Sequence, residues 1–172
     1  MRRSSCEAAI VSTMQRRQTS IPRQWLIVDR SLGPDVRDVA RTLPLGSGVF
    51  LVASDLPQRE QARLRSRLRQ VARSRRLILL DEAAGDAVRV HDIRELRRAG
   101  LARTQLLFLS PMFPTRSHPD WQPLRRLRAA ALTQLARSPV IALGGMNERR
   151  FRRIRRLGFS GWAGIDAWRP RT

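Results

Sequence analysis

Short apolar runs alternate with longer amphipathic segments along the chain, and this alternation constrains the fold more than any other feature. Seven runs of four to six residues are largely apolar, which predicts strands buried on both faces: residues 25–28, 48–53, 77–80, 87–90, 106–109, 140–143 and 161–165. Helical patterning predicts helices between them: residues 34–43, 56–75, 93–99, 124–137 and 148–157. Buried strands that alternate with helices are typical of a parallel sheet in an α/β protein.

Polar residues and glycines gather where these strands end. Asp29, Asp81 and His91 each follow a strand directly, and Gly144–Gly145 and Asp166 follow the last two. No G-x-G-x-x-G turn follows a strand, which disfavours an open dinucleotide-binding sheet. Because the carboxyl ends of all strands converge on one face of a barrel, we expect a (βα)8 TIM-type barrel. Only about six residues separate the third strand from the fourth, too few for a helix and a further strand, so we expect one βα unit to be missing.

The 172 residues, 42% of them hydrophobic, suffice for one core, and we expect residues 25–172 to form a single domain. We expect residues 1–24, rich in Arg and Ser, to be disordered or to be an over-extended gene start, with translation from Met14. The longest apolar run in this segment, residues 8–11, is too short for a signal-peptide core or a membrane span. We therefore expect a cytoplasmic protein with no membrane partner.

The net charge of +20 makes nucleic-acid binding one hypothesis, because a basic surface attracts phosphate backbones. All 34 basic residues are arginines, and many occur as pairs on polar helix faces. Aromatic residues make up only 5% of the chain and Tyr is absent, so a stacking platform for single strands is not expected. These features favour solvated helix faces over a nucleic-acid surface.

Residues that are absent or scarce exclude several kinds of chemistry. The chain has no Lys, which excludes a lysine Schiff base. A single Cys6 excludes an internal disulfide and a cysteine-rich zinc site. His91 and His118 are too few for an all-histidine metal centre.

Two segments carry candidate chemistry. In LFLSPMFPTRSHPDW, residues 107–121, an apolar strand leads into a proline-stiffened loop with two hydroxyls, a guanidinium and an imidazole, a selection that suits an anion pocket. In VIALGGMN, residues 140–147, Gly144 and Gly145 allow backbone N–H groups to approach an anion, and Asn147 is placed to cap the next helix. An ordinary tight turn is the alternative for Gly-Gly alone. The pairing of both segments favours an anion site.

These segments resemble the thiamine phosphate synthase / thiazole tautomerase (TenI-like) family, whose members are (βα)8 barrels with a G-P-x-F-x-T-x-T-K-like loop and a V-x-A-I-G-G-I segment. The resemblance is specific over roughly residues 87–168 and weaker over residues 25–82. It implies an enzyme of thiamine biosynthesis, a transferase that joins hydroxymethylpyrimidine diphosphate to thiazole phosphate and releases pyrophosphate with the help of Mg²⁺. The partners would be small phosphorylated substrates, with homo-oligomers frequent in the family.

Carried over residue by residue, the resemblance implies a phosphate site for the thiazole half. It has two hydroxyl positions and two backbone segments: Thr115, Ser117, Gly144, Gly145, Gly164 and Ile165. Asp166 departs from the family pattern, because an acid beside a phosphate is unfavourable unless its side chain points elsewhere.

The resemblance is less complete in the diphosphate half. The family's Q-x-R-x-K pattern on the second strand reads Phe50, Val52 and Ser54. Family register makes Asp81 the candidate Mg²⁺ ligand and aligns Arg89 and His91, the catalytic candidates, with the family's Ser-x-His, with Arg89 in place of the Ser. His118 stands where the family has the loop Lys. Arg30, Arg116 and His118 are the candidate contacts for the diphosphate or pyrimidine, the two arginines because arginine binds phosphate well.

Three readings therefore stay open beside the distant possibility of a nucleic-acid binder. The first is the synthase. The second is a tautomerase-like enzyme whose acid/base residue is His91 or His118. The third is a non-catalytic barrel that binds a phosphorylated ligand and has lost the diphosphate site.

Overall fold

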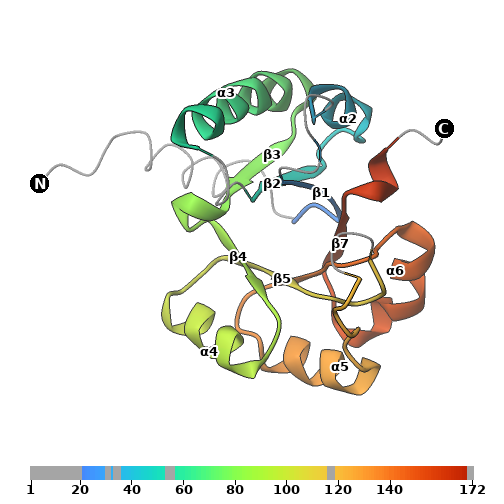
Figure 1. Ribbon diagram of the computed structural model, residues 1–172. Coiled ribbons are helices and arrows are strands. Elements are labelled where there is room, and N and C mark those ends of the chain that lie inside the picture. The colour runs from blue at the N-terminus through green and yellow to red at the C-terminus, as the bar shows by residue number, and fades with distance from the viewer. Residues whose placement is uncertain (1–20, 30–31, 33–35, 53–56, 116–118, 170–172) are drawn as a thin grey trace, which may run out of the picture.

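The computed structural model describes residues 21–29, 32, 36–52, 57–115 and 119–169, and seven strands lie within this part of the chain. They are β1 Gln24–Val28, β2 Gly48–Leu51, β3 Ile78–Asp81, β4 Ala87–Val90, β5 Leu106–Leu109, β6 Val140–Ala142 and β7 Gly161–Gly164. All neighbouring strands pair in parallel, in the order β3-β2-β1-β7-β6-β5-β4. The result is a nearly closed barrel of the TIM type (Figure 1), which confirms the predicted fold class.

Helices cover the outside of this barrel. They are α2 Val36–Thr42, α3 Gln58–Arg75, α4 Ile93–Leu101, α5 Arg126–Leu135 and α6 Glu148–Ile154, with short 3-10 turns η2 Glu82–Ala84, η3 Arg155–Leu157 and η4 Asp166–Trp168. Figure 1 shows α2 and α3 against the β1–β3 side, while α4, α5 and α6 lie outside the remaining strands. The predicted helices are confirmed, with ends displaced by a few residues.

The barrel interior is a packed apolar core to which every strand contributes. Its residues are Trp25, Ile27, Phe50, Val52, Leu80, Ala87, Leu106, Phe108, Ile141 and Ala163. Phe50 stacks on Phe108 with ring centroids 4.3 Å apart, and Trp25 meets Phe108 edge-on at 5.5 Å. Gly48 starts β2 because a Cβ at this position would lie under 3.0 Å from the Trp25 ring. The core fills the barrel and leaves the strand ends to form a site.

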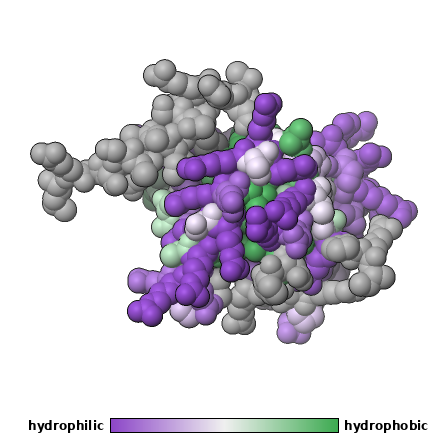
Figure 2. All heavy atoms as spheres, turned by 90° about the horizontal axis from the view of Figure 1, so that it is seen from above, coloured by the Kyte–Doolittle hydropathy of each residue, from purple (hydrophilic) through white to green (hydrophobic). Residues whose placement is uncertain are grey.

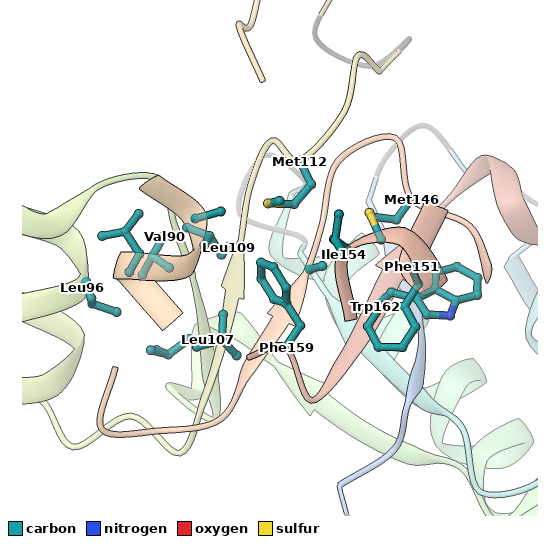
Figure 3. Close-up of a cluster of buried hydrophobic side chains, with 14 of the residues drawn as sticks. Val90, Leu96, Leu107, Leu109, Met112, Met146, Phe151, Ile154, Phe159 and Trp162 are labelled. Atoms are coloured by element: carbon teal, nitrogen blue, oxygen red, sulfur yellow. The ribbon is translucent and has the colours of Figure 1, made fainter. Parts of the chain in front are cut away.

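Side chains of the opposite strand face pack outward against the helices, as the two-residue period of a strand requires. Figure 3 shows one of these clusters, in which Val90 and Leu107 of the strands lie toward Leu96 of α4. At its other end, Phe151 of α6 packs beside Trp162 of β7. A matching cluster lies beneath α2 and α3. Strands buried on both faces explain why the apolar runs of the sequence are continuous.

The junction between β3 and β4, residues 82–86, is where the barrel departs from eight strands. It contains only the short turn η2, as predicted from the spacing, and no ladder joins β3 to β4 among the described residues. The Asp81 carboxylate accepts a hydrogen bond from the Ala83 N–H at 3.0 Å, and the Asp81 N–H donates to the Asp86 carboxylate at 3.1 Å. Burial raises the pKa of Asp86. The hydrogen bond from the Asp81 backbone N–H lowers this pKa, and the negative charge of the Asp81 side chain raises it further. Polar side chains therefore hold this junction together.

The surface over α3 is strongly basic. Arg59, Arg63, Arg67 and Arg73 are exposed on this helix, and Figure 2, which looks onto the α2 and α3 side, shows mainly hydrophilic side chains there. Leu68 and Val71 lie on the opposite face of α3 and are buried. This is the pattern of a solvated amphipathic helix. In the part of the chain that the structure describes, no helix is long and apolar enough to cross a membrane.

Candidate functional site

A pocket of about 790 Å³ opens at the carboxyl ends of the strands. Six of its lining residues directly follow a strand: Asp29 after β1, Val52 after β2, His91 after β4, Ser110 after β5, Leu143 after β6 and Ile165 after β7. In barrel enzymes the active site lies at this face, because loops from several strands converge there. The pocket is therefore the candidate site, and the predicted convergence of these strand ends is observed.

The two segments singled out in the sequence pack directly on each other at this pocket. The Met112 N–H donates to the Leu143 carbonyl at 2.9 Å, and the Phe113 N–H donates to the Gly144 carbonyl at 3.1 Å. Gly144 and Gly145 have φ angles of +89° and +59°. A Cβ on Gly145 would also lie under 3.0 Å from the Pro114 carbonyl oxygen. Both positive φ and close packing thus require glycine here, which gives the Gly-Gly turn a structural role beside its predicted one.

Most of the predicted phosphate-binding residues share this pocket. Those that line it are Thr115, Gly144, Gly145, Gly164 and Ile165. They come from the loops after β5 and β6 and from the end of β7, and these three strands are neighbours in the sheet. The other predicted contacts in these loops and after β1 lie outside the described residues: Ser117, Arg30, Arg116 and His118.

Asn147 caps α6, as its position in the sequence predicts. Its side-chain oxygen accepts a hydrogen bond from the Arg150 N–H at 2.9 Å. The cap fixes the first turn of α6 directly after the Gly-Gly turn. Side chains of that first turn are thereby held at the rim of the pocket.

His91 lines the pocket and is held by a carboxylate. Its Nδ1 lies 2.8 Å from Glu95 Oε2, which also accepts the His91 backbone N–H at 2.7 Å. The Trp121 ring meets the imidazole edge-on, with centroids 5.0 Å apart. Asp92 caps α4, the helix that carries Glu95, and hydrogen bonds from the backbone N–H groups of Glu95 and Arg94 lower the pKa of Asp92. Because Nδ1 is engaged, Nε2 is the ring nitrogen that would meet a ligand in the pocket.

Arg89 also lines the pocket, but its guanidinium is paired. Nε and Nη2 donate to the two carboxylate oxygens of Glu82 at 2.9 and 3.1 Å. This bidentate geometry is the strongest form of an arginine–carboxylate contact. A ligand phosphate would have to compete with Glu82 for Arg89.

Asp81 lies apart from the residues that line the pocket. Its carboxylate accepts a hydrogen bond from the Arg65 guanidinium and caps η2 through the Ala83 N–H. Within the described part of the chain, no group of three or more His, Cys, Asp or Glu side chains could hold a metal ion. Magnesium prefers several oxygen ligands, and the Asp81 carboxylate is already engaged by the Arg65 guanidinium, so the residues around Asp81 do not fit the ion.

Two residues of the α6 first turn contribute contacts that the sequence did not single out. Arg150 donates a hydrogen bond through Nη1 to the Gly145 carbonyl, and its guanidinium lies over the Phe113 ring at 5.0 Å. Glu148 accepts hydrogen bonds from the Trp162 indole N–H at 3.0 Å and from arginine side chains. Burial raises the pKa of Glu148, but these contacts outweigh it, so the pKa is lowered overall. The signal in the sequence was the position of both residues just after Asn147, at the end of the Gly-Gly loop.

Comparison with known proteins agrees with this fold. The sequence model of the family described as thiamine monophosphate synthase matches residues 38–168. Among solved structures, the chain is similar to the thiamine phosphate pyrophosphorylase from Pyrococcus furiosus, with a TM-score of 0.69 and 21% sequence identity over 84% of this chain and 86% of that one. At this identity the likeness concerns the fold, and no curated protein matches the sequence significantly. Because the family match spans well over half of the chain, the protein belongs to the thiamine monophosphate synthase family.

Proposed function

We propose that the protein is a thiamine phosphate synthase-like transferase that binds thiazole phosphate at the barrel mouth and joins it to hydroxymethylpyrimidine diphosphate. The observation that carries this proposal is the convergence of Thr115, the Gly144–Gly145 turn and residues 164–165 on one pocket. Family membership supports the reaction class.

The phosphate of the thiazole half would be bound by the Thr115 hydroxyl and by backbone N–H groups of the two glycine-containing segments. Glycines expose these N–H groups without a side chain, so an anion can approach closely. Ser117 remains the predicted second hydroxyl. Bound in this way, the thiazole ring would be oriented with its nitrogen toward the methylene carbon of the pyrimidine substrate, and pyrophosphate would leave as that bond forms.

The diphosphate half has less support among the described residues. Phe50 is buried in the barrel core, Arg89 is paired with Glu82, and Asp81 lies away from the pocket lining. The leaving group nevertheless needs positive charge as it departs. The proposal assigns this task to Arg30, Arg116 and His118, and no step of it is assigned to magnesium.

A second candidate function is a tautomerase-like proton transfer, and one specific observation favours it. His91 lines the same pocket and has Nδ1 held by Glu95, an arrangement that fixes the imidazole for acid/base chemistry at Nε2. This reaction needs no binding site for a diphosphate. It would act on the same thiazole phosphate.

The test is to give the purified protein both substrates, with and without Mg²⁺, and to measure thiamine phosphate and pyrophosphate. We expect product, and we expect Thr115→Val to weaken thiazole phosphate binding. Thr42→Val is the matched control, because the Thr42 hydroxyl bonds only locally in α2, to the Val39 carbonyl at 2.8 Å. If thiazole phosphate binds but no product forms, the synthase reaction is excluded. Proton exchange at the thiazole that disappears in His91→Gln would then establish the second candidate, and its absence would indicate a binding protein.

A further inference from the structure

The arginines that line the pocket are not equivalent. They are Arg89, Arg149, Arg150 and Arg169. Arg89 is paired with Glu82 at 2.9 Å, and Arg169 lies 3.8 Å from the Asp166 carboxylate. Arg149 is exposed to solvent. Arg150 is half-buried, and no carboxylate in the described part of the chain lies within ion-pair distance of it.

Contacts on two sides hold the Arg150 side chain in place. Nη1 donates to the Gly145 carbonyl, and Cζ of the guanidinium lies 5.0 Å from the centre of the Phe113 ring. The backbone of Arg150 is fixed as well, because its N–H bonds to Asn147. The guanidinium therefore lies between the Gly-Gly turn and the loop that leads to Thr115. A side chain already ordered in this way loses little further entropy when it binds a ligand.

The charge of Arg150 is not balanced by these contacts. A guanidinium carries five N–H donors, and a carbonyl and an aromatic face are both neutral partners. A half-buried cation without a counter-charge is unfavourable, and an anion bound in the pocket would remove that cost. Arginine suits a phosphate group in particular, because its planar fork can donate two parallel hydrogen bonds.

We propose that Arg150 binds the phosphate group of the ligand at the barrel mouth, beside the Gly144–Gly145 turn, and so selects phosphorylated ligands over their alcohols. This inference rests on the proposed function, since it takes the ligand to be a phosphate ester. The rival explanation is that Arg150 only positions the loop. In that case the loss of the Arg150 side chain would weaken the binding of phosphorylated and unphosphorylated ligands equally.

The experiment measures affinity by titration calorimetry for thiazole phosphate, for the unphosphorylated thiazole alcohol and for inorganic phosphate. The variants are Arg150→Gln, Arg150→Lys and the control Arg153→Gln. Arg153 is exposed on the same helix and lies outside the pocket lining, so its replacement changes the net charge equally. We expect Arg150→Gln to weaken thiazole phosphate binding by about 10- to 100-fold and to leave the alcohol unchanged. Arg150→Lys should weaken thiazole phosphate binding less, because lysine keeps the positive charge but not the planar fork of donors.

Three results would overturn the inference: equal losses for phosphate ester and alcohol, equal losses in Arg150→Gln and Arg153→Gln, or no loss at all. Thermal unfolding of each variant checks that the loop and barrel remain folded. If the wild-type protein binds inorganic phosphate but not thiazole phosphate, the proposed function fails, and the same variants then judge Arg150 with phosphate alone. If neither anion binds, both proposals are wrong.

Discussion

Replacing Asp81 with Asn separates a structural role of this residue from a metal-binding one. In the structure its carboxylate caps η2 and pairs with the Arg65 guanidinium. The side chains are only 17% and 28% exposed, so the pair is shielded from solvent. Asn keeps an oxygen that can accept the Ala83 N–H, and it removes the charge opposite Arg65.

The expected loss follows from these contacts. A hydrogen bond to a charged group contributes about 1.5–3 kcal/mol. Removal of the Asp81 charge also relieves its repulsion of Asp86, which offsets part of that loss. We therefore expect Asp81→Asn to lower the free energy of unfolding by about 2 kcal/mol. For a chain of this length that corresponds to a Tm lower by about 4–8 °C.

Urea and thermal unfolding measure this change, and Asp38→Asn is the matched control. Asp38 pairs with Arg41 at 3.4 Å, but its side chain is 79% exposed, so its replacement should cost less than about 0.5 kcal/mol. Thiazole phosphate affinity should be the same in Asp81→Asn and wild type. Unchanged stability together with loss of a Mg²⁺-dependent activity would refute the reasoning and make Asp81 a metal ligand.

Three further predictions concern the turn, the α6 rim and the junction. Gly145→Ala should weaken both folding and thiazole phosphate binding, because φ is +59° at this position. Gly100→Ala, with open space around its Cβ, should instead stabilise α4 by about 0.5–1 kcal/mol. Calorimetry that shows no difference between the two variants would contradict this prediction. Glu148→Gln should destabilise the protein at neutral pH, because the folded-state pKa of Glu148 is lowered. Urea titrations should show the greater stability of the wild type above about pH 4.3, and this difference should vanish as the pH falls through the lowered pKa. Asp86→Asn should instead raise the stability at neutral pH, because the raised pKa of Asp86 means that its ionised form is disfavoured in the folded protein. The difference in stability should be gone below about pH 3.9. A variant that is less stable than wild type at neutral pH would contradict this prediction.

The barrel was predictable because its strands are buried on both faces. A side chain inside the barrel, such as Phe108, and its outward neighbour, such as Leu107, are both apolar, so each strand reads as a continuous run. The same reading located the site, because residues that follow a strand, such as His91, must lie at the mouth of a parallel barrel. The spacing between β3 and β4 also predicted the missing unit, since chain length alone excludes a helix and a strand there.

Side-chain pairing within the site was not predictable in the same way. Arg89 follows the family register at the pocket, but its guanidinium meets Glu82, seven residues earlier, across the junction. Arg150, which adjoins Arg149, belongs to the arginine pairs that the sequence assigns to polar helix faces, yet its side chain bonds to the Gly145 carbonyl. Both outcomes depend on how two loops meet in space, which neither periodicity nor composition records.

The short β3–β4 junction links the shape of this barrel to the chemistry that its mouth can support. Without a further βα unit, two sheet edges face each other, and polar side chains must hold them in place of ladder hydrogen bonds. Arg89 of β4 pairs with Glu82 of η2 across this junction, and Asp81 at the end of β3 bonds to Ala83 and Asp86 within it and pairs with Arg65 of α3. In the proposed synthase reaction, a bound diphosphate would therefore compete with Glu82 for Arg89. The residues proposed to bind thiazole phosphate come instead from the loops after β5 and β6 and from the end of β7.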